Sequence, residues 1–215
     1  LAHMALPLIG QGLVRFHGEV RPSAEVLAEF GMKPVKLGAK EGLALTNGTT
    51  LMTAIGALQV FDAQIIVSSA NYAAALSLEA QNGTLRAYSP QIHASRPQAM
   101  QAETAATLRE MLNGSQLVLP DSSTNVQDAY TLRCVPQVHG AVHSAVNYAQ
   151  SVIETELNSV TDNPLLFFDE QNEVTILSGG NFHGEPLALA LDFLSLAMTD
   201  LGNMSERRIA KLIHN

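Results

Sequence analysis

The stretch PQVHGAVHSAVNYAQSVIETELNSV, residues 136–160, decides the fold class of this chain. Its apolar residues recur in steps of three and four, which is the spacing of one face of an α-helix. They are Val138, Ala141, Val142, Ala145, Val146, Ala149, Val152, Ile153 and Leu157. We therefore predict a helix over residues 136–160, which Asp162-Asn163-Pro164 ends, because the residue before a proline disfavours helical backbone.

Helical patterns also dominate on both sides of this stretch. We expect further helices over residues 1–10, 24–30, 41–81, 98–112 and 186–213, the third being one long or two consecutive buried helices. Extended segments are expected over residues 14–20, 165–168 and 174–177, the last two as a hairpin, and loops over residues 90–97 and 115–126. Because strands and helices do not alternate, the sequence predicts a mainly α fold, an elongated helical bundle with small irregular and β-hairpin insertions.

Charge and cysteine content exclude several classes of protein. The net charge is −8, and the only clustered basic residues are Arg207 and Arg208. Nucleic-acid and anionic-membrane surfaces need basic patches, so neither partner is expected. Residues 42–78 carry a single charge, but their many amide and hydroxyl side chains favour a buried helix over a membrane span. A single cysteine, Cys134, and the absence of a basic signal-peptide region predict a cytoplasmic protein.

Several familiar site patterns are incomplete. His139 and His143 are four residues apart, as two metal ligands on one helix face would be, but no third ligand is indicated. We therefore expect no metal site and two packed or hydrogen-bonded histidines. Cys134 has no obvious base beside it and is expected to be a buried structural thiol. The glycine pairs do not extend to a phosphate-binding fingerprint.

Polar residues inside apolar segments are more informative. Asn47 lies within an apolar segment, where burying an amide costs free energy unless it finds partners. Gln127, Tyr130 and Arg133 are spaced by three, which on a helical turn would align an amide, a phenol and a guanidinium. Arginine suits a carboxylate, and a tyrosine beside a cation can act as a base. Phe182 follows two glycines. These residues could equally form a structural polar network.

Four segments resemble one known family. They are residues 41–49 (EGLALTNGT), 126–140 (VQDAYTLRCVPQVHG), 161–164 (TDNP) and 178–186 (SGGNFHGEP). In order and spacing they are similar to the aromatic amino-acid ammonia-lyase family, and the resemblance covers essentially the whole chain. The form FHGEP is most similar to the histidine ammonia-lyase branch of that family.

The resemblance implies an elimination, L-histidine to trans-urocanate and ammonia. It also implies a prosthetic electrophile, 4-methylidene-imidazol-5-one (MIO), made by cyclisation of an Ala-Ser-Gly triad. Catalytic roles fall by similarity to three residues. Tyr130 would transfer a proton at the substrate, and Asn47 and Gln127 would hydrogen-bond the prosthetic group or the substrate. Such an elimination needs both an electrophile and a base, because the β-proton is weakly acidic and ammonia leaves poorly.

Substrate binding is implied for three further residues. By similarity, Arg133 would hold the substrate carboxylate with help from Asn163, and Phe182 would pack against the prosthetic ring. No Ala-Ser-Gly occurs in the 215 residues, and the family's triad lies just before a segment like Leu1–Met4. We therefore expect the triad upstream of Leu1. Residues 1–215 would be the central part of a single ammonia-lyase-like helical domain, inactive alone.

The resemblance also implies a homotetramer whose active sites are shared between subunits. Substrate choice stays open on the sequence alone, because a phenylalanine or tyrosine ammonia-lyase or an aminomutase would share these motifs. The sequence also leaves open which tyrosine is the β-proton base. A non-catalytic helical scaffold is an alternative of a different class. A fumarase-like helical lyase would need a Gly-Ser-Ser loop, which this sequence lacks.

Overall fold

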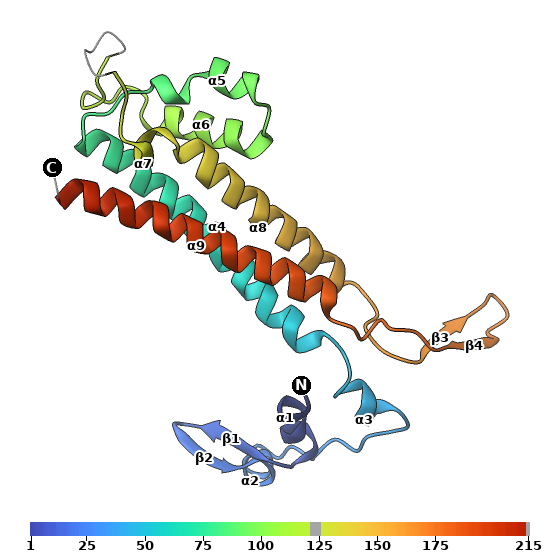
Figure 1. The fold of residues 1–215 in the computed structure, drawn as a ribbon. Coiled ribbons are helices and arrows are strands. Elements are labelled where there is room, and N and C mark those ends of the chain that lie inside the picture. The colour runs from blue at the N-terminus through green and yellow to red at the C-terminus, as the bar shows by residue number, and fades with distance from the viewer. Residues whose placement is uncertain (121–125, 214–215) are drawn as a thin grey trace. The chain divides into compact units, whose positions relative to one another are not determined.

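The structure, a computed structural model, describes residues 1–120 and 126–213 and confirms the mainly α fold (Figure 1). The helices are α1 (Ala2–Ala5), η1 (Leu6–Ile9), α2 (Ser23–Glu29), α3 (Glu41–Ala44), α4 (Thr50–Ala80), η2 (Arg86–Tyr88), α5 (Pro90–Ser95), α6 (Ala99–Met111), α7 (Tyr130–Arg133), α8 (Val135–Leu157) and α9 (Glu185–Ile213). The strands are β1 (Leu13–Phe16), β2 (Glu19–Pro22), β3 (Leu165–Phe168) and β4 (Val174–Leu177). The predicted loop over residues 115–126 lies partly outside the described residues, at 121–125.

The chain divides into two compact units. The first contains residues 1–55 and 155–186, and the second contains residues 56–154 and the chain from Leu187 onward. All four described strands belong to the first unit, and most of the long helices belong to the second.

The first hairpin of unit one owes its turn to two residues with left-handed backbone. Phe16 pairs with Glu19, so His17 and Gly18 form the connection. Their φ angles are 49° and 88°. A two-residue turn with positive φ at both positions matches the twist of the flanking strands. The excursion expected over residues 14–20 is thus a complete hairpin.

The second hairpin forms at the residues that the sequence predicted. Leu165 pairs with Leu177 in an antiparallel register. In the connection, one carboxylate oxygen of Asp169 accepts hydrogen bonds from the backbone N–H groups of Gln171 and Glu173, at 2.9 and 2.8 Å. Such side-chain bonds to nearby backbone stabilise turns that have no strand partners.

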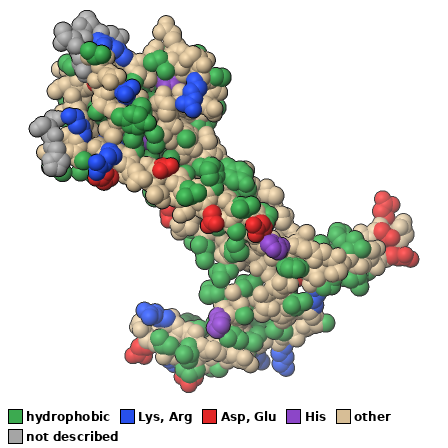
Figure 2. Space-filling view, viewed as in Figure 1, with side chains coloured by type: hydrophobic (Ala, Val, Ile, Leu, Met, Phe, Trp, Pro, Cys, Tyr) green, Lys and Arg blue, Asp and Glu red, His purple; other side chains and the backbone are tan. Residues whose placement is uncertain are grey.

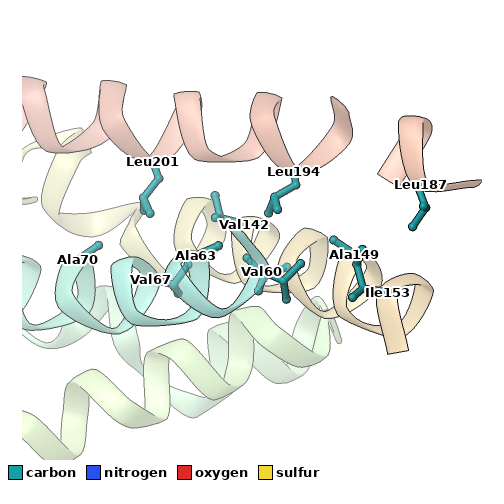
Figure 3. Packing of buried hydrophobic residues seen from close by; sticks show 11 residues of the cluster. Val60, Ala63, Val67, Ala70, Val142, Ala149, Ile153, Leu187, Leu194 and Leu201 are labelled. Carbon is teal, nitrogen blue, oxygen red and sulfur yellow. The ribbon is translucent and has the colours of Figure 1, made fainter. Parts of the chain in front are cut away.

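An apolar seam joins α4, α8 and α9 in unit two (Figure 3). Each helix contributes residues spaced by three, four or seven positions, so each presents one face to the other two. Alanine and valine dominate on α4 and α8, which lets these helices approach closely. The seam consists of Val60, Ala63, Val67, Ala70, Val142, Val146, Ala149, Ile153, Leu187, Leu194 and Leu201.

Only one face of α4 is buried among the described residues, although the sequence predicted a buried helix. Leu58 and Phe61 are 66% and 60% exposed. By length and composition alone, α4 and α9 are apolar enough to cross a membrane. Their packing on α8 instead gives the apolar residues of one face a protein environment.

The prediction of a loop over residues 90–97 is wrong in part, because Pro90–Ser95 forms the helix α5. Two prolines mislead a reading of the sequence here. Pro90 stands at the first helical position, where proline is tolerated because the N–H it lacks would have no partner. Pro97 ends the helix by forcing Arg96 into extended backbone, with φ −134° and ψ 86°.

We predict opposite effects for two helical glycine substitutions. A Cβ on Gly140 of α8 would lie 2.5 Å from the Cα of Gln101 in α6, whereas a Cβ on Gly202 of α9 would meet nothing within 4 Å. Gly140→Ala should therefore lower the free energy of unfolding by about 1–3 kcal/mol through overpacking. Gly202→Ala should raise it by about 0.5–1 kcal/mol, because alanine is the better helix former. Urea unfolding of both variants measures the difference, and equal effects would contradict the close approach of α6 and α8.

Candidate functional site

The turn α7 carries two of the six predicted site residues. Tyr130 opens it and is 64% exposed, while Arg133 closes it and is half-buried. The guanidinium carbon of Arg133 lies 5.8 Å from the centre of the Tyr130 ring, within the range of a cation–π contact. The turn therefore pairs a phenol with a fixed positive charge, as the spacing of these two residues predicted.

Gln127 does not lie on this turn, so the prediction that it shares a helical face is wrong. The helix begins only at Tyr130, because Ala129 before it is extended, with φ −53° and ψ 148°. Gln127 is nevertheless near, since it lines the same depression as Tyr130 and Arg133, which has a volume of about 470 Å³.

That depression has a cationic lining. Lys211 of α9 and Arg133 contribute two positive charges, Asp128 contributes one negative charge, and Gln81 contributes an amide. The Nε of Arg133 and the Nε2 of Gln81 are both buried and have no hydrogen-bond partner among the described residues. Donors without acceptors beside two cations suit a carboxylate or another anion. The sequence indicated neither Gln81 nor Lys211, because no motif contains them.

Tyr130 also lines a second, more apolar groove. It has a volume of about 520 Å³ and runs between α8 and α9, where Val138, Ala141 and Phe193 line it. Two acceptor-capable atoms in its lining are buried without partners in the described part of the chain, Oγ1 of Thr131 and Oε1 of Gln137. Tyr130 thus borders both a cationic depression and an apolar groove.

Unit one holds the remaining predicted residues on three segments that pack together. A Cβ on Gly48 would lie 2.9 Å from the carbonyl oxygen of Thr161, which brings the segment of Asn47 against that of Asn163. A Cβ on Gly184 would lie 3.7 Å from Thr49, so the segment of Phe182 also lies close to that of Asn47.

Hydrogen bonds fix the orientation of the Asn163 carboxamide. Its Oδ1 accepts the backbone N–H of Gly179 at 2.7 Å and the hydroxyl of Ser178 at 3.2 Å. A backbone N–H can only donate, so the oxygen must face the loop and the NH2 group must face away. Neither that NH2 group nor the side chain of Asn47 has a hydrogen-bond partner within the described residues. Both amides can therefore serve a ligand.

An ion pair steadies the segment of Asn163. The Nζ of Lys40 lies 2.5 Å from Oδ2 of Asp162 and donates to the carbonyl of Pro164 at 2.8 Å. The hydrogen bond from Lys40, followed by that from the Asn163 backbone, lowers the pKa of Asp162. The sequence did not indicate this pair, because its partners are separated by 122 positions.

The six predicted residues therefore fall into two groups. Gln127, Tyr130 and Arg133 gather around the depression in unit two. Asn47, Asn163 and Phe182 lie on the converging segments of unit one.

His139 forms hydrogen bonds, as predicted, and has no metal-ligand cluster around it in the described residues. Its Nδ1 lies 2.7 Å from Oδ1 of Asn71, and its Nε2 lies 3.3 Å from Nη2 of Arg208. Arginine can only donate, so Nε2 carries the lone pair and Nδ1 carries the proton. Burial, and then the charge of Arg208, lower the pKa of His139 to about 3. Cys134 is half-buried rather than fully buried.

Comparison with known proteins shows which family this chain is similar to. The family model for aromatic amino acid lyases matches residues 1–215. Histidine ammonia-lyase of Chloroflexus aurantiacus is 55% identical over 212 residues, which are 99% of this chain and 40% of that protein. The chain thus spans about two fifths of the length of this curated relative.

Two solved structures are also similar to nearly the whole of this chain. Tyrosine aminomutase from Streptomyces globisporus is 39% identical and superposes with a TM-score of 0.89, over 99% of this chain and 43% of that one. Histidine ammonia-lyase from Trypanosoma cruzi is 43% identical with a TM-score of 0.85, over 97% of this chain and 38% of that one.

The environment of His139 predicts a specific pH dependence. An unfolded histidine titrates near pH 6.5, whereas the folded one titrates near 3. Between these values the unfolded state binds more protons, so the free energy of unfolding falls as the pH falls. His139→Gln should reduce that slope by about 1.4 kcal/mol per pH unit between pH 6 and pH 4. Urea unfolding at several pH values measures it. The exposed His3→Gln serves as the control, and an unchanged slope in His139→Gln would refute a buried neutral imidazole.

Proposed function

This chain belongs to the aromatic amino acid lyase family, and we propose that the protein it forms eliminates ammonia from L-histidine to give trans-urocanate. In this reaction the Cβ–H bond breaks and its proton goes to a base. The electron pair forms the Cα–Cβ double bond, and the C–N bond breaks to release ammonia. The name and 55% identity of the Chloroflexus relative support histidine as substrate.

The pairing of Tyr130 with Arg133 is the observation that carries the proposal. Arginine holds a carboxylate with two parallel hydrogen bonds, and the buried, unpartnered Nε of Arg133 can provide one of them. An amino acid held this way would bring its β-carbon near an adjacent phenol. Tyr130 is exposed and borders an apolar groove that suits the remainder of the substrate. We therefore assign Arg133 to carboxylate binding and Tyr130 to proton transfer.

Asn163 is proposed as a second donor to the carboxylate. Its oxygen is occupied by the Gly179 N–H, so its NH2 group is the part that remains for a ligand. Gln127 lines the depression beside Arg133 and can bind the substrate or the prosthetic group.

The family's prosthetic group, MIO, fits the residues present. Asn47 offers an amide that lacks a partner among the described residues, and Phe182, 36% exposed, offers an aromatic face. We propose that these two residues hold the group and that its Ala-Ser-Gly precursor lies outside residues 1–215, since none occurs within them. When bound, the group supplies an electrophile that makes the amino group a better leaving group.

Assembly into a homotetramer with shared active sites, in the cytoplasm, completes the proposal. Hydrophobic side chains lie exposed on the long helices of unit two (Figure 2). They include Leu58, Phe61, Ile65, Leu196 and Ile209, a set that a second subunit would cover. The single cysteine fits a reducing compartment, and the absence of a basic cluster beyond Arg207 and Arg208 fits a small-molecule substrate.

The proposal predicts which product forms. The natural full-length polypeptide should convert L-histidine to trans-urocanate, followed by ultraviolet absorbance, much faster than it converts phenylalanine or tyrosine. Residues 1–215 alone should give no urocanate. Tyrosine aminomutase is similar in structure, so a β-amino acid product without free ammonia is the second candidate. Amino-acid analysis and an ammonia assay separate the two, and no product from any aromatic amino acid would exclude both.

Arg133 allows a sharper test. Arg133→Lys keeps the charge but loses the two-pronged geometry. We expect kcat/KM for histidine to fall roughly 10- to 100-fold, the cost of losing a hydrogen bond to a charged group. Arg15→Lys changes an exposed arginine of β1 and should have no effect. Equal kcat/KM in the two variants would remove Arg133 from the carboxylate site.

A further inference from the structure

The turn α7 and the helix α8 meet at a carbonyl group that has lost its helical partner. In an uninterrupted helix the carbonyl of residue 132 accepts the N–H of residue 136. Residue 136 is Pro136, which has no N–H. Leu132 is only 2% exposed, so water has little access to its carbonyl. A buried acceptor without a donor costs free energy, and the turn needs one from elsewhere.

Tyr88 supplies that donor. Its hydroxyl donates a hydrogen bond to the carbonyl oxygen of Leu132 at 2.5 Å, across 44 residues of sequence. Tyr88 is 1% exposed, and this burial raises the pKa of its hydroxyl. The group therefore stays protonated and remains a donor over the whole neutral pH range.

The position of the Tyr88 hydroxyl is itself fixed. Nη1 of Arg109, on α6, donates to the backbone carbonyl of Tyr88 at 2.5 Å. The ring belongs to a core cluster with Leu108, Leu132 and Val135. Because its backbone and its ring are both held, the Tyr88 hydroxyl keeps the Leu132 carbonyl in one position.

Thr84, four residues before Tyr88, also binds the chain just before α7. One carboxylate oxygen of Asp128 accepts the backbone N–H of Thr84 at 2.8 Å and its hydroxyl at 2.9 Å. Thr84 and Tyr88 thus hold the turn near its start and near its end. The Tyr88 hydroxyl bonds the backbone of α7 itself, whereas Thr84 bonds the side chain of Asp128, two residues before the turn begins.

We infer that Tyr88 is a positioning residue for Tyr130 and Arg133. It bonds the carbonyl of Leu132, which lies between Tyr130 and Arg133 and which Pro136 leaves without its regular helical donor, and so fixes both side chains in relation to α8. This inference rests on the proposed function only for the roles of Tyr130 and Arg133. Being buried, Tyr88 acts through the turn and does not touch a substrate itself.

The test compares Tyr88→Phe with Tyr72→Phe in the natural full-length protein. Both substitutions remove one hydroxyl, but Tyr72 is 61% exposed and makes no hydrogen bond among the described residues. In Tyr88→Phe, amide hydrogen exchange of a peptide covering residues 127–135 should accelerate roughly tenfold, because the turn opens more easily. Exchange of the seam peptides should not change. Tyr72→Phe should change neither.

Kinetics supply a readout that lost stability alone would not produce. A smaller folded fraction lowers kcat and leaves KM unchanged, whereas a displaced Arg133 also raises KM. We expect Tyr88→Phe to lower kcat/KM by roughly 10- to 100-fold, with part of the loss in KM. Thr84→Val, which removes only one bond to Asp128, should give a smaller loss of the same kind. It keeps the test decisive if Tyr88→Phe folds poorly.

Two outcomes would overturn the inference. One is exchange over residues 127–135 that matches the Tyr72→Phe control, and the other is a loss confined to kcat in both Tyr88→Phe and Thr84→Val. If the unaltered protein turns over no aromatic amino acid, the proposed function fails. The exchange measurement still decides whether Tyr88 fixes the turn.

Discussion

Burial of the apolar seam between α4, α8 and α9 is the interaction on which unit two depends. The three helices are separated by long stretches of chain, so no local hydrogen bonding can hold them together. Small side chains such as Ala63 and Ala149 let the helices approach, and each helix presents a single stripe to the other two. Because the seam fixes α8, it also fixes the point at which α7 joins that helix, and with it Tyr130 and Arg133.

The polar interior begins where the seam ends. His139, Asn71 and Arg208 form a chain of hydrogen bonds in which only a neutral imidazole can fit, because arginine cannot accept. Burial lowers the pKa of Arg208 and raises that of Tyr88, so burial disfavours the ionised form of each group. The Tyr88 bond, together with the core cluster around Leu132, holds the turn from inside the molecule.

Local periodicity made much of the fold predictable. The repeat in residues 136–160 and the pattern before Ile213 gave α8 and α9 within a few residues, and the β3–β4 hairpin was correct at both strands. The helix α5 was missed because its leading proline also suits a loop. Gln127 was placed on the turn because spacing alone cannot show where a helix starts.

In the candidate site, too, only the residues whose contacts are local in sequence were predictable. Tyr130 and Arg133 were predictable because four residues of one turn set their proximity. Tyr88, Asp128 and Lys211 were not assigned a role, since their contacts join residues far apart in the sequence and depend on helix packing. Long-range hydrogen bonds carry no periodic signal, and a sequence without an aligned relative does not mark them.

A crystal structure of the full-length protein with bound histidine or urocanate would test the central claim most directly. The account predicts that the ligand carboxylate forms two hydrogen bonds with the guanidinium of Arg133 and that the Tyr130 hydroxyl lies against the β-carbon. A carboxylate bound by other residues, with Arg133 and Tyr130 turned to solvent, would contradict it.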